Sequence, residues 1–283
     1  MNITGHTRVF MIVGDPVAQV RAPEVYNPLF RRHGVDAVLV PMKVAPAALA
    51  GFVRHAFQAQ NLGGMWVTIP HKAAMQGLMD RCDDLAMLAG AVNAVRRADD
   101  GAIEGALYDG VGFVKGLDHF GVAVAGRRVL VVGAGGGGQA VAAAVAQREP
   151  AVVAVANRSP ARAAELVARL TPAFGQRMQR AESTDPAGYD LVINCTSQGL
   201  KPDDPLPFEV ARVDAGATVV DIIMTREPTP LLKACAARGL SAHAGFEMLV
   251  QQIPEYLRFF GLQQLAATLQ EDMAEVRAVL YPK

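Results

Sequence analysis

An apolar stretch that runs directly into a glycine-rich turn constrains the fold of this chain more than any other segment. Residues 129–132 are followed by Gly133, Gly135 and Gly138, which carry the spacing G-x-G-x-x-G, and then by a run of small residues. Such glycines allow a tight turn and let the backbone approach a pyrophosphate. The free N–H groups at the start of the following helix then bind the phosphates. The pattern predicts a dinucleotide site formed by Gly133, Ala134, Gly135, Gly136, Gly137 and Gly138.

A second apolar stretch, residues 152–156, ends at Asn157, Arg158 and Ser159. At this position NAD enzymes carry an acidic residue for the ribose 2′-hydroxyl, and NADP enzymes carry an arginine for the 2′-phosphate. Arg158 occurs here without a carboxylate, and Arg162 follows one helical turn later. Both arginines could instead form a solvated helix start, but the pattern favours NADP(H) over NAD(H).

Length, charge and cysteine content limit the class of protein. A chain of 283 residues exceeds what one hydrophobic core usually supports, so we expect two domains. The 27 basic and 27 acidic side chains balance, which argues against nucleic acid or a membrane surface as a partner. The apolar runs have strand length, and the first ten residues carry no signal segment. The three cysteines are scattered and the six histidines form no ligand cluster, so we expect a cytoplasmic protein without a metal site.

Strands and helices alternate along the chain, which predicts an α/β fold with mostly parallel sheets. We expect strands at 9–13, 38–40, 65–68, 191–194 and 218–221, and helices at 23–33, 46–60 and 110–120. Residues 1–115 would form an N-terminal substrate domain, and residues 120–245 a C-terminal Rossmann-type NADP-binding domain. The tail, 247–283, is expected to form two helices that complete the first domain.

Three polar side chains in the first half of the chain have no obvious structural need. Lys72 follows a strand end, where ligands of open parallel sheets bind, and Asn93 lies in an apolar run. Asp109 stands at a helix start, where capping is the ordinary alternative. A cation and a carboxylate together can exchange a proton with a substrate hydroxyl while a hydride moves to a nicotinamide. The set therefore favours a hydride-transfer enzyme.

The order and spacing of these motifs resemble those of the shikimate dehydrogenase family, which reduces 3-dehydroshikimate with NADPH. The resemblance spans nearly the whole chain. Besides the glycine-rich turn and Asn157-Arg158-Ser159, it rests on Gly14-x-Pro16, residues 67–72, residues 90–93, Asp109-Gly110-x-Gly112, Asn194-Cys195-Thr196-Ser197-x-Gly199, Asp221, residues 229–232 and residues 245–252.

The resemblance implies roles for individual residues. Lys72 and Asp109 would be the catalytic pair, while Thr68, Asn93 and Gln252 would bind the substrate. On the cofactor side, Arg158 and Ser159 would hold the 2′-phosphate, and Asn157 and Arg162 would also contact the cofactor. Residues 194–197, with Thr196 and Ser197 among them, would border the nicotinamide.

The chain departs from the family pattern at the loop that holds the substrate carboxylate. Two serines that usually donate hydroxyls to it are replaced by Val20 and Ala22. Hydrogen bonds to a charged group contribute about 1.5–3 kcal/mol each, so two lost bonds would cost ~3–6 kcal/mol, or roughly two to four decades in affinity. Trp66 replaces an asparagine, Tyr108 a threonine and Met224 a tyrosine. Either other groups hold the carboxylate or the substrate differs.

Candidates for a replacement anchor are Arg21, Gln19 and Tyr108. Arg21 could pair bidentately with a carboxylate, although its position between the two replaced serines favours an outward orientation. Trp66 could narrow the pocket or pack in the core, and Met224 could contact the nicotinamide or fill a gap.

Alternative functions stay open at this point. The first is a related dehydrogenase that acts on quinate or another hydroxylated ring acid. The second is a non-catalytic NADP(H)-binding sensor, against which the retained Lys72 and Asp109 argue. A dehydrogenase of pteridine-type one-carbon carriers is disfavoured by residues 91–93 and 248–252. A homodimer is one possible oligomeric state.

Overall fold

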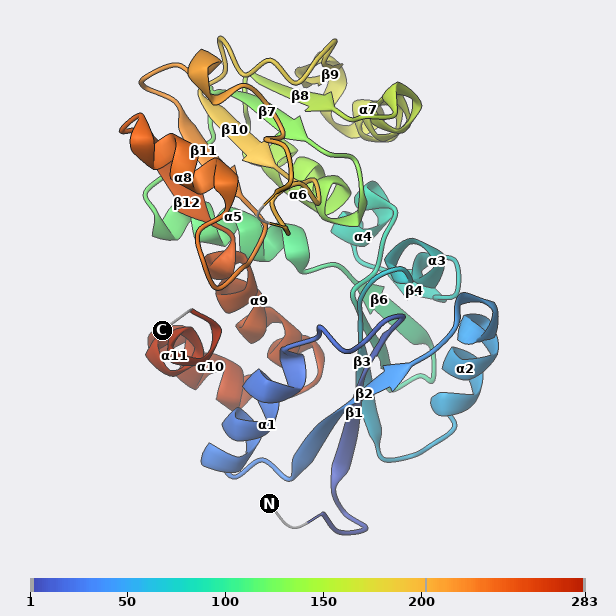
Figure 1. The fold of residues 1–283 in the computed structure, drawn as a ribbon. Helices are drawn as coiled ribbons and strands as arrows, with labels where there is room; N and C mark the ends of the chain where they lie inside the picture. Colours follow the sequence, from blue (N-terminus) through green and yellow to red (C-terminus); the bar gives the residue numbers. More distant parts are fainter. Residues whose placement is uncertain (1–2, 202, 282–283) are drawn as a thin grey trace. The chain divides into compact units, whose positions relative to one another are not determined.

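The computed structural model describes residues 3–201 and 203–281, which form two units (Figure 1). The first unit comprises the described residues 3–108 and 253–280, and the second comprises residues 109–201, 203–252 and 281. The expected domain ranges include residues 1–2 and 282–283, which lie outside the described residues. Each unit contains a six-stranded sheet with helices, so the predicted α/β class is confirmed.

The sheet of the first unit has the strand order β2-β1-β3-β5-β6-β4. Its strands are β1 (Arg8–Gly14), β2 (Ala37–Lys43), β3 (Leu62–Val67), β4 (Arg81–Cys82), β5 (Ala94–Arg97) and β6 (Ile103–Ala106). Strand β1 pairs in parallel with β2 and β3, whereas β5 is antiparallel to both β3 and β6. The carboxyl ends of the parallel strands β1, β2 and β3 therefore share one edge of the sheet.

The helices of the first unit surround this sheet. They are α1 (Ala22–Arg32), the 3₁₀ turn η1 (Pro46–Ala48), α2 (Leu49–Ala56), α3 (Lys72–Gln76) and α4 (Asp84–Ala89). The helix expected over residues 46–60 is thus shorter, because its first turn is 3₁₀ and α2 ends at Ala56.

The C-terminal tail forms three helices, so the expectation of two was wrong. They are α9 (Phe246–Phe259), α10 (Gln263–Glu271) and α11 (Ala274–Leu280). Gly261 adopts a φ of 76° just after α9, and Asp272 has extended backbone after α10. Asp272 Oδ1 also accepts a hydrogen bond from the Ala274 N–H at 2.7 Å, which starts a new helix.

The sheet of the second unit is entirely parallel and has the order β12-β11-β10-β7-β8-β9. Its strands are β7 (Arg128–Val132), β8 (Val152–Ala156), β9 (Met178–Arg180), β10 (Leu191–Asn194), β11 (Thr218–Asp221) and β12 (Ser241–Ala244). The strand order reverses between β7 and β10, which is the Rossmann arrangement and the usual place for a dinucleotide. The predicted Rossmann-type fold is confirmed.

The helices of the second unit include one made almost wholly of small residues. They are α5 (Asp109–His119), α6 (Gly136–Ala146), α7 (Pro160–Phe174) and α8 (Pro230–Ala237), with the 3₁₀ turns η2 (Gly175–Arg177) and η3 (Val210–Arg212). Helix α6 is buried along nearly its whole length and contacts α5, β7 and β8. Among the residues that the structure describes, no helix has both the length and the apolar character that a membrane span requires.

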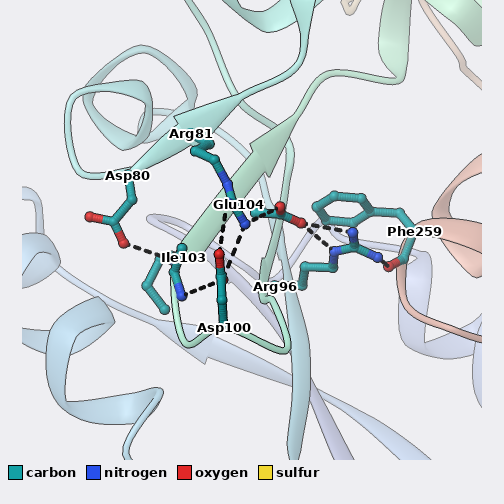
Figure 2. Close-up of polar contacts among 8 residues, drawn as sticks. Asp80, Arg81, Arg96, Asp100, Ile103, Glu104 and Phe259 are labelled. Atoms are coloured by element: carbon teal, nitrogen blue, oxygen red, sulfur yellow. Dashed lines mark hydrogen bonds and ion pairs between the residues drawn. The ribbon is translucent and has the colours of Figure 1, made fainter.

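Charged side chains fix the far edge of the first sheet (Figure 2). Arg81 on β4 contacts Asp100 at 2.8 Å and Glu104 at 2.7 Å. Glu104 also pairs with Arg96 at 2.7 Å, and Arg96 donates to the carbonyl of Phe259 at 2.7 Å while its guanidinium lies over the Phe259 ring. This chain of contacts ties the sheet edge to the end of α9.

Candidate active site

The carboxyl ends of β1 and β3 lie side by side in the first unit. Thr68 N donates to the Val13 carbonyl at 2.9 Å, and Asp15 N donates to the Ile69 carbonyl at 3.0 Å. At Gly14 a Cβ would lie 2.4 Å from Thr68 Cγ2, so a side chain there would displace Thr68. The loop that follows β1 therefore starts beside Thr68, as expected if both segments belong to one substrate site.

Lys72 begins α3, directly after the turn that follows β3. Its carbonyl accepts a hydrogen bond from Val92 N at 2.9 Å, which joins it to the segment that carries Asn93. The neighbouring His71 is buried, and its Nε2 lies 2.7 Å from the Val44 carbonyl. His71 thus serves the structure, and Lys72 is held between two loops at the sheet edge.

Asn93 has a buried amide group that is only half satisfied. Its side chain has no exposed surface, and its Oδ1 accepts from Tyr108 N at 2.9 Å. Its backbone pairs with Val67 and Ala106. Its Nδ2 is buried and has no hydrogen-bond partner within residues 3–201 and 203–281. Since buried donors are almost always paired, this Nδ2 is suited to a ligand oxygen.

Tyr108 is held by aromatic contacts in the same unit. Its ring packs edge-on against Tyr256, at a centroid distance of 5.2 Å, and against Phe259 at 5.9 Å. Burial raises the pKa of the Tyr108 hydroxyl, so the hydroxyl stays protonated and remains a donor. Arg96 in turn contacts Phe259, against which the Tyr108 ring packs.

The two other candidate anchors make contacts within the protein. The Arg21 guanidinium donates to the carbonyls of Leu280 at 3.0 Å and Val279 at 2.7 Å, and its Nε lies 3.6 Å from Glu24. Gln19 Nε2 donates to the Pro16 carbonyl at 2.9 Å. Arg21 thus supplies positive charge to the C-terminal end of α11, where a cation is favourable.

Trp66 packs in the core of the first unit. It is 3% exposed, and its ring centroid lies 4.4–5.5 Å from those of four other aromatic residues: Phe10, Tyr26, Tyr256 and Phe260. Its buried Nε1 makes no hydrogen bond of normal geometry with any described residue. The packing alternative for Trp66 is thus the better description, and the residue replaces an amide by an aromatic surface.

Asp109 and Gln252 lie on neighbouring helices of the second unit. Asp109 begins α5 and is 5% exposed. At Gly112 a Cβ would lie 2.2 Å from the Met248 carbonyl oxygen, so α5 and α9 touch at this point. Gln252 is 6% exposed, and its buried Oε1 has no hydrogen-bond partner in the described part of the chain. Like the Asn93 amide, it is suited to a ligand hydroxyl.

The glycine-rich turn has the form that a pyrophosphate needs. Gly133 has a φ of 112°, and a Cβ there would lie 2.7 Å from the Cys195 backbone. Gly135 precedes α6, no side chain caps the helix start, and a Cβ on Gly135 would meet no atom within 4 Å. The start of α6 is therefore open to a ligand, and its N–H groups attract anions.

Asn157, directly after β8, holds this turn by hydrogen bonds. Its Oδ1 accepts from Ala134 N at 3.0 Å, and its Nδ2 donates to the Ser159 carbonyl at 3.0 Å. These two hydrogen bonds give Asn157 a positioning role within the turn, and its expected contact with the cofactor stays a prediction.

A small pocket lies beside Arg158 at the carboxyl ends of β8 and β9. Its volume is about 100 Å³, and its lining includes Asn157, Arg158, Arg180, Ser183 and Thr184. Ser159 and Arg162 are exposed at the start of α7 and do not belong to this lining. Sequence reasoning missed Arg180, because β9 has only three residues and lacks an apolar run.

A buried polar network fixes the loops after β10 and β11. Asn194 Oδ1 accepts from Thr196 N at 3.0 Å and from its Oγ1 at 2.7 Å, and Asn194 Nδ2 donates to Asp221 Oδ1 at 3.0 Å. Asp221 Oδ2 accepts from Thr229 Oγ1 at 2.6 Å. Burial raises the pKa of Asp221, and the hydrogen bonds from Thr229 and Asn194 oppose that rise. Ser197 is exposed and Met224 is half-buried on these loops.

No metal centre is found in the part of the chain that the structure describes. No three His, Cys, Asp or Glu side chains lie close enough there to hold an ion. Cys82, Cys195 and Cys235 are all free thiols.

Comparisons with known proteins give one family for both units. The family described as the shikimate dehydrogenase substrate binding domain matches residues 12–95, and that described as shikimate / quinate 5-dehydrogenase matches residues 117–202. A shikimate dehydrogenase (NADP(+)) of Acidiphilium cryptum is 40% identical over 93% of this chain and 94% of its own length.

Solved structures agree with this assignment. Shikimate dehydrogenase from Aquifex aeolicus is 28% identical, with a TM-score of 0.83 over 96% of this chain and 100% of that one. The ligand-free 5-ketofructose reductase of Gluconobacter sp. strain CHM43 is 27% identical, with a TM-score of 0.82 over 95% of this chain and 99% of that one. The chain, with its Lys72 and Asp109 motifs and its Rossmann unit, belongs to the shikimate dehydrogenase family.

Proposed function

We propose that this chain is an NADP-dependent dehydrogenase that interconverts 3-dehydroshikimate and shikimate. The observation that carries the proposal is that two buried amide atoms, Asn93 Nδ2 and Gln252 Oε1, have no hydrogen-bond partner among the described residues. Both occur in motifs shared with a family whose relative from Acidiphilium cryptum is named shikimate dehydrogenase (NADP(+)). A buried donor and a buried acceptor without partners fit a substrate that carries several hydroxyls.

The cofactor-binding residues belong to the second unit. The backbone N–H groups of residues 135–138 at the start of α6 bind the pyrophosphate, and Arg158 pairs with the 2′-phosphate. Arg180 lines the same pocket, where it pairs with Glu182 at 2.9 Å. Thr196, Ser197 and Met224 border the nicotinamide on loops that Asn194 and Asp221 hold in place. When bound, NADPH supplies the hydride.

Lys72 and Asp109 act together on the substrate oxygen. In the reducing direction they deliver a proton to the carbonyl oxygen as the carbonyl carbon is reduced, and in the oxidising direction they accept it. Thr68, Asn93 and Gln252 bind the remaining substrate hydroxyls and so orient the reacting carbon.

The test is the initial rate of NADPH formation from NADP⁺ with shikimate, with NAD⁺ as the cofactor control. We expect saturable turnover that depends on NADP⁺. Binding of NADP⁺ without turnover of any ring alcohol would contradict the proposal and favour a sensor.

Another hydroxylated substrate is the second candidate. The altered loop, with Val20 and Ala22, favours it, and one matching family description includes quinate. The Gluconobacter relative is named for a ketose, which carries no carboxylate. Quinate in the same rate measurement separates this candidate from shikimate.

We also propose that the protein acts in the cytoplasm, as a homodimer, without a nucleic-acid partner. The balanced charge and the free thiols support the location and the lack of such a partner. Sedimentation of the purified protein tests the oligomeric state.

A further inference from the structure

We propose that this active site binds its substrate without a charge-specific contact to a carboxylate, and that it reduces neutral polyhydroxylated ketones as a second substrate class. The inference rests on the proposed function, because it assumes the same hydride transfer and the same Lys72 and Asp109 pair. It concerns the groups that the first unit presents beside Thr68.

The loop after β1 supplies no hydroxyl side chain. Residues 17–22 read Val-Ala-Gln-Val-Arg-Ala, so the polar side chains in this stretch are Gln19 and Arg21. Gln19 is bonded to the Pro16 carbonyl, and Arg21 is bonded to the carbonyls at the end of α11. If Arg21 turned toward a substrate carboxylate, it would leave those carbonyls without their donor, which opposes the change.

The other basic side chains on adjoining segments also have partners inside the protein. Lys43, at the end of β2, is exposed and lies 3.7 Å from Asp15. His71 is buried against the Val44 carbonyl. Lys72 is needed at the reacting oxygen. Neither the Lys43 contact nor the His71 contact is the bidentate, buried pairing by which proteins usually hold a carboxylate.

The groups that remain suit neutral oxygens. Asn93 offers one buried N–H donor, which a hydroxyl or a carbonyl oxygen satisfies with an ordinary hydrogen bond. Trp66 stands where the family pattern has an amide, but it packs in the core among four other aromatic rings and so offers a carboxylate no polar contact. A carboxylate that is buried without partners is strongly disfavoured, whereas a hydroxylated neutral carbon chain is not.

The chemical step is unchanged for such a substrate. The ketone carbon gains a hydride, its oxygen gains a proton from the Lys72 and Asp109 pair, and the ketone becomes a secondary alcohol. NADPH is oxidised to NADP⁺ in the same step, so atoms and electrons balance.

The decisive comparison uses shikimate and its methyl ester, which share a ring but differ in charge. We expect kcat/KM for the two, measured with NADP⁺, to agree within about tenfold, whereas two charged hydrogen bonds would separate them by about 10²–10⁴-fold. With NADPH, 5-keto-D-fructose serves as the neutral ketone, and we expect saturable NADPH oxidation.

A double variant, Val20→Ser with Ala22→Ser, returns two hydroxyls to the loop. It should raise the ratio of kcat/KM for shikimate over the ester by at least about tenfold. Ala18→Ser is the matched control, since Ala18 is an exposed residue of the same loop, and it should leave the ratio unchanged. Arg21→Ala should change both substrates to the same extent.

Each result supports or overturns the proposal. The proposal is overturned if the wild-type enzyme oxidises shikimate, has a kcat/KM for the methyl ester more than about a hundredfold lower, and does not reduce 5-keto-D-fructose. A selective loss of shikimate turnover in Arg21→Ala identifies Arg21 as the carboxylate anchor and also overturns it. Absence of turnover with all three compounds would instead refute the proposed function. This outcome differs from those that refute the present inference alone.

Discussion

Asn157 Oδ1 accepts the backbone N–H of Ala134 at 3.0 Å, so the end of β8 holds the turn that follows β7. This bond uses the N–H of the second residue in the glycine-rich stretch, so the N–H groups at the start of α6 stay available to phosphates. The amide Nδ2 meanwhile donates to the Ser159 carbonyl, which fixes the orientation of the side chain. One asparagine therefore sets the shape of the turn and the start of the loop that carries Arg158.

Replacing Asn157 by alanine should weaken NADP(H) binding. The Ala134 N–H is buried and would lose its acceptor, which costs about 1–3 kcal/mol, or a factor of about 5 to about 150 in Kd if the turn shifts. Calorimetric titration with NADP⁺ measures the effect. Gln179→Ala is the control, because it removes the amide of an exposed residue in β9, and it should bind NADP⁺ as the wild type does. Equal affinities for Asn157→Ala and wild type would show that the bond does not shape the site.

Arg158→Ala should discriminate between the two cofactors. A charged hydrogen bond to the 2′-phosphate contributes about 1.5–3 kcal/mol, so the Kd for NADP⁺ should rise about 10- to 150-fold, while the Kd for NAD⁺ stays nearly constant. Arg177→Ala, at an exposed residue of η2, should change neither value. A uniform loss for NADP⁺ and NAD⁺ would contradict the 2′-phosphate assignment.

Lys72→Met should lower turnover more than it lowers affinity. General acid–base groups contribute about 10²–10⁴-fold to rate, so kcat for shikimate oxidation should fall within that range while KM changes little. Lys43→Met removes an exposed lysine near the same sheet edge and should preserve kcat. A rise in KM with kcat unchanged would assign Lys72 to binding alone.

Gly112→Ala should destabilise the protein through direct overlap between α5 and α9. The new Cβ would lie 2.2 Å from the Met248 carbonyl oxygen, and overpacking of this kind costs about 1–3 kcal/mol. Tm should fall by about 2–10 °C. Gly51→Ala, in α2, meets no atom within 4 Å and should keep or raise Tm. Equal Tm values for Gly112→Ala and wild type would mean that the two helices separate without cost.

The carboxyl of Asp221 should make stability depend on pH. Burial raises its pKa in the folded protein above the ordinary value of 3.8, so the folded state binds this proton more tightly than the unfolded state does. The stabilisation is therefore present below the ordinary pKa, and it is lost as pH rises through the folded pKa. Urea unfolding measures the free energy of unfolding of the wild type and of Asp221→Asn at each pH. The value for the wild type minus the value for the variant should decline from about pH 4 upward.

Thr229→Val provides a second variant for the same relationship. It removes a hydrogen bond that lowers the pKa of Asp221, so the loss of stability should extend to higher pH than in the wild type. A difference between wild type and Asp221→Asn that grows with pH would show that the carboxyl titrates in the opposite sense.

Features that follow from local patterns could be predicted from the sequence. The strands expected at 191–194 and 218–221 coincide with β10 and β11, because apolar runs at these places end in a polar residue at the sheet edge. Gly133 has the positive φ that its place in the turn requires. By contrast, β4 has two residues and is held by ion pairs of Arg81 rather than by an apolar run, so no pattern reveals it.

Contacts between distant residues explain what could not be predicted at the candidate site. Thr68, Lys72 and Asn93 come from strand ends and neighbouring loops, so general rules for parallel sheets indicate where they lie. The partner of Arg21 is 258 residues away along the chain, and no local pattern encodes it. The same holds for Asn157. Its motif indicates a cofactor contact, and only the structure reveals its hydrogen bond to Ala134.

The bonds from Arg21 to the carbonyls of Val279 and Leu280 give the last helix an influence on the loop after β1. Glu275 of the same helix also pairs with Arg32 and His33 at the end of α1. Substitutions in α11 can therefore shift the start of α1, and with it Val20 and Ala22, without any change in the loop itself. If the loop after β1 selects the substrate, as we propose, substitutions in this C-terminal helix should alter substrate preference although they lie far from that loop in sequence.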